Sequence, residues 1–515
     1  MISNKWLNDT VIYQIYPQSF YDTNGDGIGD LRGIIEKLGY IKSLGVNAIW
    51  LNPFYESTFY DAGYDITDFC KVAKRYGTNE DFKELCDKAH EMGIKVLCDL
   101  VPGHTSIEHP WFKESSKAER NEYTDRYIWT NSKDETYFRM NVRDYERDGQ
   151  YRCNFFAIQP SLNYGYAYVN RPWQFHMDDE VCMQTRNEIK KIMDFWINLG
   201  CDGFRVDMAD CLIKHDNDHT VNMKIWQDFR AWLDENHPDC ILMSEWGEPP
   251  KSIPGGFHVD MLVGGFHASY TSLFRYEYDS SRNGCSYFRK EGKGYIYDFL
   301  DSYYNWFKET KNDGYISIPS SSHDNHRIGY GRDTDELKTA FAFIMTMPGV
   351  PIVYYGDEIG MDYIEGLEKE GSKQRGGSRT PMQWVKGEKN FGFSSSDDPY
   401  FPCDPKESAP SVSEQEKSDD SLLNTVRRFI SLRHNHKALQ GNCELTLLPS
   451  GAMYPFAYER KCDDETIHII VNPAGRCEDY YERDNIDCVL DSLHARIEGS
   501  QIYIDGPGYI IYKVN

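Results

Sequence analysis

The sequence has no long uninterrupted hydrophobic segment. Its longest apolar stretch, residues 340–355 (AFAFIMTMPGVPIVYY), is broken by Pro348, Gly349 and Pro351. It is also shorter than the roughly 20 residues that a membrane-spanning helix needs. The first ten residues (MISNKWLNDT) lack the apolar core of a secretory signal peptide. We therefore expect a protein without a membrane anchor, located in the cytoplasm.

Paired cysteines are also missing. The chain has 14 cysteines, but none forms a Cys-x-x-Cys pair and none has the spacing of a metal-binding cluster. Cys98, Cys201 and Cys240 lie within apolar, strand-like runs. That placement is typical of small buried side chains in a reducing compartment. The cysteines therefore do not predict a disulfide framework.

Positive charge is scarce. Lys and Arg number 56 against 81 Asp and Glu, which gives a net charge of −25. Such a surface repels nucleic acids and anionic membranes, so neither is an expected partner, and it argues weakly against a highly anionic substrate. Aromatic residues, in contrast, are abundant, with 37 Tyr, 26 Phe and 11 Trp. Most belong to the core, but carbohydrate sites also use aromatic faces because the C–H faces of sugars are apolar.

Strand-like runs alternate with helix-like segments over the first four-fifths of the chain. The eight runs are VIYQIYPQSF (11–20), AIWLNP (48–53), KVLCDL (95–100), GFRVDM (203–208), CILMSEW (240–246), HVDMLVGG (258–265), GYISIPSSSH (314–323) and GVPIVYYGDE (349–358). Alternating β and α elements imply a parallel sheet, and eight strands fit a closed (β/α)8 TIM barrel. Among the helices, residues 79–93 form an amphipathic pattern with Asn79 as the expected N-cap.

The chain divides into the barrel and two further parts. Residues 104–172 show no helix period, so we expect an inserted subdomain after the third strand, between the barrel residues 1–103 and 173–435. Short β-rich runs separated by turn residues follow, and residues 436–515 are predicted to form a C-terminal antiparallel β-sandwich domain. The predicted fold class is therefore α/β, with an insertion and a β domain.

Three acidic residues each stand at the end of a short apolar run. They are Asp207 in GFRVDM, Glu245 in ILMSEW and Asp324 in SSHDNHR. A single acid after a strand is more often a helix N-cap or a loop residue. If the runs are parallel strands of one barrel, however, the three carboxylates converge on its C-terminal rim, where such barrels carry their active sites. A pair of carboxylates with a third acid nearby is what cleavage of a glycosidic bond requires.

The segment DTNGDGIGD (22–30) spaces oxygen-bearing groups as a calcium loop does. The candidate ligands are Asp22, Asn24, Asp26, the backbone carbonyl of Ile28, and Asp30. The same residues also fit a polar β-turn with Asx caps. The spacing alone leaves both interpretations open.

The order of these motifs resembles the α-amylase family of glycoside hydrolases, and within it the oligo-1,6-glucosidase and α-glucosidase branch. The matching segments run nearly end to end: VIYQIYPQSFYDTNGDGIGDLRGI, GYDI, DLVPGHTS, QPSLN, GFRVDM, SEW, SHDNHR, GVPIVYYGDEIGM and SRTPMQW. The resemblance implies that Asp207 is the nucleophile, that Glu245 is the general acid and then the base, and that Asp324 is the third acid. It also favours a structural Ca²⁺, or Mg²⁺, in the 22–30 loop.

The resemblance further implies residues that bind the terminal glucose. Tyr64 would stack beneath the sugar ring. Asp65 and Arg379 would hold the terminal 4-hydroxyl and close the pocket beyond one glucose, which favours removal of single glucose units. A loop-anchoring ion pair is the structural alternative for Arg379.

Other residues complete this candidate site. His104 and His323 would donate to sugar hydroxyls, and Arg327 is a further candidate for the pocket lining. Arg205 stands two residues before Asp207, on the same face of the strand, and would keep that carboxylate ionised. A histidine near a strand end is more often a structural residue, and Arg205 could instead form a structural salt bridge.

Some positions depart from the family pattern. Gly103 stands where Asn is common, so we predict no second, interdomain calcium site. Met208 follows the nucleophile where 1,6-specific enzymes usually have Val and 1,4-specific ones Ala, so the linkage preference stays open.

The expected function is a retaining, exo-acting α-glucosidase. It would hydrolyse terminal α-linked glucose from short oligosaccharides or disaccharides through a β-glucosyl-enzyme intermediate. The alternative is a transglucosylase or isomerase of the same family that rearranges trehalose or sucrose. It stays open because both kinds of enzyme form the β-glucosyl-enzyme in the same first step. A non-catalytic relative is disfavoured since all three acids are present. Aglycone and oligomeric state are not predicted.

Overall fold

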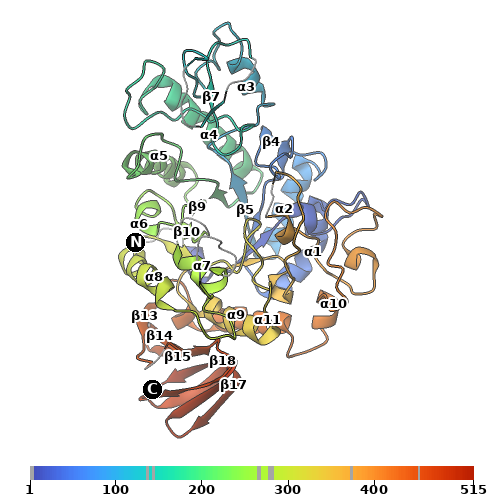
Figure 1. Ribbon diagram of the computed structural model, residues 1–515, viewed down its shortest axis with the longest axis vertical. Helices are drawn as coiled ribbons and strands as arrows, with labels where there is room; N and C mark the ends of the chain where they lie inside the picture. Colours follow the sequence, from blue (N-terminus) through green and yellow to red (C-terminus); the bar gives the residue numbers. More distant parts are fainter. Residues whose placement is uncertain are drawn as a thin grey trace.

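The computed structural model describes residues 5–134, 139–141, 145–263, 268–276, 284–371, 375–450 and 453–515. Figure 1 shows three parts along the long axis of the molecule. The inserted segment with α3 (Pro110–Ser115) and β7 (Tyr151–Arg152) lies at one end, the barrel in the middle, and the C-terminal sheet at the other end.

Eight parallel strands form the barrel, and each lies within one of the predicted runs. They are β1 (Ile12–Ile15), β2 (Ala48–Leu51), β5 (Lys95–Leu100), β8 (Gly203–Val206), β9 (Ile241–Glu245), β10 (Val259–Met261), β11 (Tyr315–Ser317) and β12 (Ile352–Tyr354). Their order is β11-β10-β9-β8-β5-β2-β1-β12, and a bridge between Pro319 and Ile352 joins the two outer strands. The predicted barrel is thus confirmed. Gly264 and Gly265 of the sixth run lie outside the described residues.

Successive side chains of the barrel strands point alternately into the barrel and toward the helices, because a strand has a period of two. Ile12, Trp50 and Met243 belong to one buried cluster, whereas neighbours such as Tyr13 and Ile49 join the larger cluster under the helices. Gly203 opens β8 where a Cβ would lie only 2.5 Å from the Ile241 side chain. The glycine of GFRVDM therefore lets β8 and β9 lie close together.

Helices cover the outside of the barrel. They are α1 (Leu31–Leu44), α2 (Asn79–Glu91), α4 (Glu180–Asn198), α5 (Thr220–Asn236), α6 (Pro249–Ser252), α7 (Ala268–Phe274), α8 (Tyr297–Thr310), α9 (Thr334–Thr346), α10 (Val412–Gln415) and α11 (Leu422–Asn435). None of the helices in the described part of the chain is both long and apolar enough to cross a bilayer. The N-cap of α2 is Thr78 rather than Asn79, because Thr78 forms a capping box with Asp81.

Two small antiparallel pairs stand at the C-terminal end of the barrel. One joins β3 (Tyr55–Ser57) to β4 (Ile66–Val72), and the loop between them carries Asp61 and Tyr64. The other joins β6 (Met140–Asn141) to β7 inside the segment predicted as an insertion. A bridge between His104 and Ser161 connects the two ends of that segment, so it returns to the rim of the barrel.

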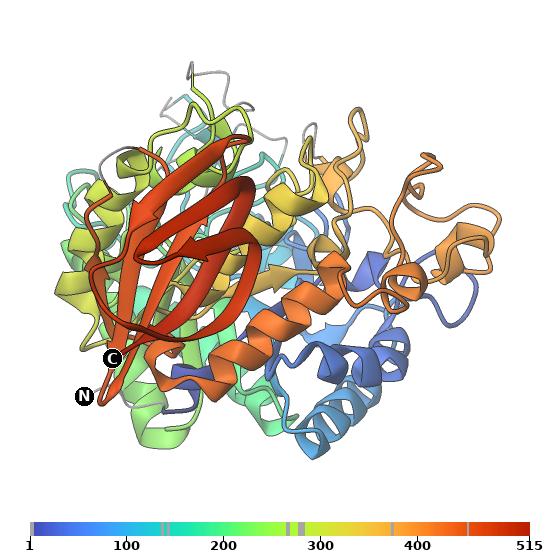
Figure 2. The same cartoon turned by 90° about the horizontal axis from the view of Figure 1, so that it is seen from below.

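The C-terminal strands form one antiparallel sheet that curls upon itself. They are β13 (Glu444–Leu447), β14 (Phe456–Cys462), β15 (Glu465–Asn472), β16 (Cys477–Tyr481), β17 (Ile486–Glu498) and β18 (Gln501–Val514). The predicted C-terminal antiparallel β domain is confirmed, and its strands belong to one curled sheet, because β18 is long enough to pair with β15, β16 and β17. Figure 2 shows this sheet beside α11. Ile469 and Ile511 pack in the core shared with the helices, while Ile470 and Tyr512 form a separate cluster.

Candidate active site

A cavity of about 560 Å³ opens at the C-terminal ends of the barrel strands. Among the residues predicted from the sequence, Asp207, Glu245, Asp324, Tyr64 and His104 line it. Strand ends supply the first two, because β8 ends at Val206 and β9 at Glu245. The three carboxylates therefore do converge on one rim.

Arg205 lies beneath this cavity and contacts three carboxylates. Its Nη1 is 2.6 Å from Asp99 Oδ1 and 3.3 Å from Asp207 Oδ1, and its Nη2 is 2.7 Å from Glu245 Oε1. The guanidinium is fully buried, so its charge is poorly screened. Arg205 thus binds both carboxylates of the predicted catalytic pair, with its closer contact to Glu245 rather than to Asp207.

The backbone after Asp207 fixes the position of Glu245. Met208 has a positive φ of 45°, which is uncommon for a residue with a side chain. Its N–H donates to Glu245 Oε2 at 3.0 Å. The turn after β8 therefore places the second carboxylate beside the first.

Burial changes the protonation of this pair. It raises the pKa of Asp207 well above the ordinary value, and the charge of Glu245 adds to the shift. Burial also raises the pKa of Glu245, while Arg205 opposes that shift. Two interacting carboxyls titrate as a unit, so the pair holds one proton over a wide pH range. It can supply both a proton donor and a negatively charged nucleophile.

Asp324 lies in a different electrostatic environment. Its Oδ1 is 2.7 Å from Arg375 Nη1 and 3.1 Å from Arg379 Nη2. Burial acts to raise the pKa of Asp324. The neighbouring His323, whose Nε2 lies 3.3 Å from Asp324 Oδ2, and the charges of the two guanidinium groups outweigh burial and lower this pKa far below its usual range. Asp324 therefore stays ionised when the Asp207–Glu245 pair holds a proton.

The floor of the cavity is a hydrogen-bonded group around Tyr64. The Tyr64 hydroxyl lies 2.8 Å from His323 Nε2, and the two rings stack with centroids 5.5 Å apart. Gln14 and Asn52 donate amide N–H groups to His323 Nδ1, each at 3.1 Å, so the ring proton is on Nε2. Burial lowers the pKa of His323, which keeps the ring neutral. His323 thus supports Tyr64 from below rather than lining the cavity.

His104 lines the cavity, but both of its ring nitrogens have protein partners. Its Nε2 donates to the Tyr64 carbonyl at 3.1 Å, and its Nδ1 accepts from the Asn154 amide at 3.1 Å. Burial lowers the pKa of His104 to about 4. Gly103 makes room for this arrangement, because a Cβ there would lie 2.7 Å from Asn154 Nδ2.

Asp65, predicted to bind a sugar hydroxyl, does not line the cavity, whereas Asp61 does. Asp65 is fully buried, and its carboxylate accepts the N–H groups of Tyr60 (3.0 Å) and Asp61 (2.9 Å) as well as the Thr58 hydroxyl. It folds the loop and is not available to a sugar. Asp61, four residues earlier, lines the cavity instead and accepts from Gln159 Nε2 at 2.8 Å.

Two arginines differ in the same way, because Arg375 lines the cavity and Arg379 does not. Arg379 is fully buried and donates to the His323 carbonyl (2.9 Å) and to Asp324, so it positions that acid from behind. Arg375 lines the cavity and forms ion pairs with Asp324 and with Asp61 (3.1 Å). Arg327 is also fully buried and donates to the Tyr355 carbonyl and to Asp357, away from the cavity.

Further residues that line the cavity were not named in the sequence analysis. They are Arg139, Phe155, Asp210, Cys211, His219, Trp246, Glu248 and Val263. Most belong to loops, which have no periodicity to reveal where a side chain points. Asp210, Cys211, Trp246 and Glu248 follow Asp207 or Glu245 closely in the chain, and this proximity is the one signal that could have indicated them.

The predicted metal loop is folded by its own side-chain oxygens. Asp22 accepts the N–H groups of Asn24 (3.0 Å) and Gly25 (2.8 Å), Asn24 accepts that of Asp26 (2.8 Å), and Asp26 that of Ile28 (2.9 Å).

Asp30 completes the loop by capping α1, with the N–H of Gly33 at 2.7 Å, and it also accepts from Thr23. Within the described residues, the carboxylates of Asp22, Asp26 and Asp30 do not gather within 4.8 Å of one another. The donor chemistry fits a hard cation, but these side chains would have to move to surround one.

Comparisons with known proteins agree with this geometry. The family model described as "Alpha amylase, catalytic domain" matches residues 14–442. An oligo-1,6-glucosidase of Parageobacillus thermoglucosidasius is 31% identical, covering 91% of this chain and 90% of its own. A trehalose synthase/amylase of Mycolicibacterium smegmatis is 32% identical over 84% of this chain and 77% of its own.

Solved structures share the same architecture. A variant of isomaltulose synthase from Erwinia rhapontici in complex with D-glucose superposes with a TM-score of 0.84, at 25% identity and over 99% of each chain. The family model covers most of the chain, and the three carboxylates predicted to be catalytic lie at the rim of the barrel. The chain therefore belongs to the alpha-amylase family of glycoside hydrolases.

Proposed function

We propose that this enzyme is a retaining, exo-acting α-glucosidase that removes terminal α-linked glucose from short oligosaccharides or disaccharides. The observation that carries the proposal is the Asp61–Arg375–Asp324 ion-pair chain on the cavity lining. It joins the β3–β4 loop to the segment after β12 and closes the cavity behind the sugar that contacts Asp207. A closed end leaves room for one terminal glucose and excludes a chain that continues beyond it.

The proposed reaction has two steps. Asp207 attacks the anomeric carbon while Glu245 gives its proton to the glycosidic oxygen, so the glycosidic bond breaks and the aglycone leaves as an alcohol. Glu245, now ionised, takes a proton from water, and the resulting attack of water releases glucose and restores Asp207. Asp324, which stays ionised, and Asp61 bind hydroxyls of the same glucose. Arg375 holds both of them in place.

The aglycone would occupy the other end of the cavity. Met208 and Trp246 offer apolar surface there, and Asp210 and Glu248 offer acceptors for hydroxyls. These residues, rather than the catalytic acids, would set the preferred linkage. Met208 is the first candidate because its backbone also positions Glu245.

A substrate panel tests the proposal. Maltose, isomaltose, sucrose, trehalose, kojibiose and an aryl α-glucoside are each incubated with the enzyme, and the products are identified together with the anomeric form first released. The expected product is free α-glucose from at least one substrate, taken from the non-reducing end. Cleavage inside longer chains, or initial release of β-glucose, would contradict the proposal.

A rearranging enzyme is the second candidate. Its support is the trehalose synthase/amylase similarity and the architecture shared with isomaltulose synthase. In that case a sugar hydroxyl, rather than water, would attack the glucosyl-enzyme. The same panel separates the two, because rearranged disaccharide in excess of free glucose would identify the isomerase.

We also infer that the 22–30 loop binds a structural Ca²⁺ or Mg²⁺. Oxygen is the donor type of every candidate ligand, which suits a hard cation. The loop lies between β1 and α1, so a bound ion would stabilise the fold and take no part in the reaction.

A further inference from the structure

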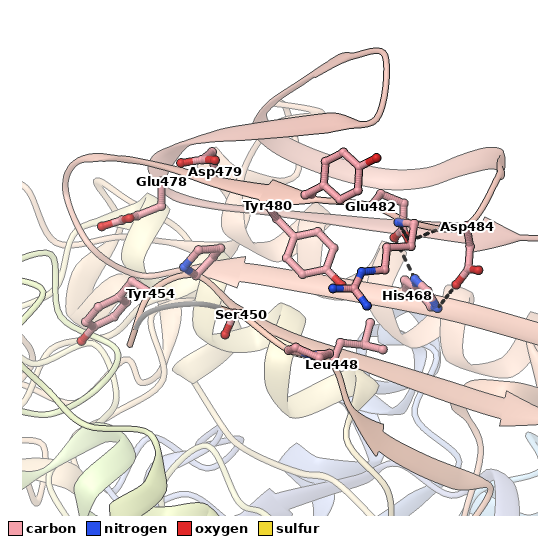
Figure 3. Close-up of a pocket in the computed structure, with 13 residues that line it drawn as sticks. Leu448, Ser450, Tyr454, His468, Glu478, Asp479, Tyr480, Glu482 and Asp484 are labelled. Carbon is pink, nitrogen blue, oxygen red and sulfur yellow. Dashed lines mark hydrogen bonds and ion pairs between the residues drawn. The ribbon is translucent and has the colours of Figure 1, made fainter.

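The C-terminal sheet carries a second cavity, of about 550 Å³, lined by residues between Leu448 and Asp484 (Figure 3). At one end of it, His468, Glu482 and Asp484 lie together with ligand atoms within 4.8 Å of one another. Among the described residues, this is the one cluster of at least three His, Cys, Asp or Glu side chains that comes so close. The glucosidase mechanism does not use it.

Glu482 fixes the orientation of the His468 ring. Its Oε2 accepts from His468 Nδ1 at 2.9 Å and from the Tyr512 hydroxyl, and its Oε1 accepts the N–H groups of Arg483 (2.7 Å) and Asp484 (2.9 Å). Both His468 and Glu482 are almost completely buried. A carboxylate that holds Nδ1–H leaves Nε2 as the ligand atom, which is the usual support of a metal-binding histidine. Without an ion, Nε2 has a long hydrogen bond of 3.4 Å to Glu459 Oε2.

Two further carboxylates stand beside His468 Nε2. Glu459 Oε2 is 3.4 Å away and Asp484 Oδ2 is 3.8 Å away. The second distance is too long for a hydrogen bond. It is close to the separation of two ligands of one zinc ion, because metal–ligand bonds of about 2.0–2.2 Å at tetrahedral angles place neighbouring ligand atoms about 3.3–3.6 Å apart.

The charges of this cluster also call for a divalent ion. Glu459, Glu482 and Asp484 surround a single imidazole, so one proton on His468 leaves negative charge in excess. A divalent ion on the neutral ring neutralises more of that charge. The Asp484 side chain is 55% exposed at the cavity, which gives an ion an entry path and room for water as a further ligand.

We propose that the His468–Glu482–Asp484 cluster binds a divalent transition-metal ion of the zinc type through His468 Nε2 and Asp484, with Glu482 as the positioning residue for the histidine. Glu459 lies outside this cluster, beside His468 Nε2, and would turn toward the ion as a third ligand. Nitrogen together with carboxylate oxygen suits zinc better than calcium. Glu459 lies on β14, His468 on β15, and Asp484 in the turn between β16 and β17. A bound ion would therefore tie three neighbouring segments of the C-terminal sheet together.

Zinc binding to EDTA-treated full-length protein tests this proposal by isothermal calorimetry near neutral pH, in two buffers of different ionisation enthalpy. We expect about one zinc per chain and proton release from His468. Asp484→Asn and Glu459→Gln should each weaken zinc binding by at least about tenfold. Asp479→Asn, at the other end of the same cavity in Figure 3, is the matched control and should bind as the wild type does.

The same measurement can overturn the proposal. Absence of zinc uptake by the wild type would show that a proton alone satisfies His468. Equal affinity in Asp484→Asn and Asp479→Asn would place any bound zinc elsewhere, and Asp26→Asn tests the 22–30 loop as that other place. Turnover of an aryl α-glucoside should be the same in the Glu459, Asp479 and Asp484 variants, because the cluster lies on the C-terminal sheet.

Discussion

At the scale of single residues, position within a loop decides what a carboxylate can do. Asp61 and Asp65 lie four residues apart between β3 and β4. Both carboxylate oxygens of Asp65 accept N–H groups of its own loop, while Asp61 faces the cavity and Arg375. Asp65 therefore stabilises the shape of the loop, and Asp61 is available to bind a sugar.

Substitution of these two acids should separate the roles. Asp61→Asn should lower kcat/KM by about tenfold to a hundredfold, because a hydrogen bond to a charged group contributes about 1.5–3 kcal/mol, with little change in unfolding temperature. Asp65→Asn should lower the free energy of unfolding by about 1–3 kcal/mol and change kcat/KM less. Steady-state kinetics and thermal unfolding of both variants check this. The reverse pattern would indicate that Asp65, and not Asp61, binds the sugar.

The pH dependence of kcat/KM reports the proton on the Asp207–Glu245 pair. As the pH falls, protonation of Asp207 removes the nucleophile; as it rises, deprotonation of Glu245 removes the acid. Burial raises both pKa values, so the profile should be a bell with its acid limb above the ordinary carboxyl range. Asp324, with its lowered pKa, should add no limb above about pH 4.

Glu245→Gln distinguishes the two limbs. With an aryl α-glucoside whose leaving group needs no proton, the variant should keep the acid limb and lose the alkaline one. With a disaccharide, its kcat/KM should fall by about a hundredfold or more, since general acid catalysis contributes about 10²–10⁴. An unchanged alkaline limb would assign it to a group other than Glu245.

The position of the predicted catalytic acids at the rim could be read from the sequence for a physical reason that the loop residues lack. Asp207 and Glu245 stand at the ends of buried strands, and parallel strands bring their ends together. Asp61 and Arg375 lie in loops, where no period tells which of two like residues, four apart, faces the cavity. Sequence reasoning therefore named Asp65 and Arg379, which are buried in the protein, whereas Asp61 and Arg375 line the cavity.

At the scale of elements, the barrel strands were predictable from the sequence, and the N-caps of the helices were less so. Every strand is an apolar run that burial requires, whereas the start of α2 depends on which of Thr78 and Asn79 reaches the first turn. Asn79 instead accepts the Val72 N–H at 2.8 Å and ties the helix to β4. In the C-terminal domain, the strands were predictable from the sequence. Their arrangement in one curled sheet was not, because it depends on the length of β18, which pairs with three other strands.

The β1–α1 loop carries the prediction that belongs to this scale. EDTA should lower the unfolding temperature of the wild type, and added Ca²⁺ should restore it, because an ion that binds only the folded loop stabilises the fold by mass action. Asp26→Asn should make the unfolding temperature insensitive to both reagents. Asp26 is the residue to change since it does not cap α1, unlike Asp30. An EDTA effect that survives in Asp26→Asn would locate the ion elsewhere, with the His468 cluster as the first alternative.

At the scale of the whole molecule, two buried arginines, one on helix α11 and one on the C-terminal sheet, bind the same turn of the barrel between α9 and β12. Arg433 on α11 donates to the carbonyls of Met345 (2.9 Å) and Met347 (3.1 Å), just before β12. Arg460 on β14 donates to the Thr346 carbonyl in the same turn and to that of Gln440 at 3.3 Å. Burial lowers the pKa of Arg433 to about 9 and also lowers that of Arg460. These side chains bind carbonyls that would otherwise be buried without a donor.

This connection predicts that barrel and sheet unfold together. Arg460→Met should lower the free energy of unfolding by about 1–3 kcal/mol, because buried carbonyls lose their donor. Arg496→Met, on an exposed part of β17, should change it by less than about 0.5 kcal/mol. Thermal unfolding followed by circular dichroism and by loss of glucosidase activity should give coincident transitions in both variants. An early transition of the sheet that leaves activity intact would show that the barrel is stable without it, and equal shifts in the two variants would remove the special role of Arg460.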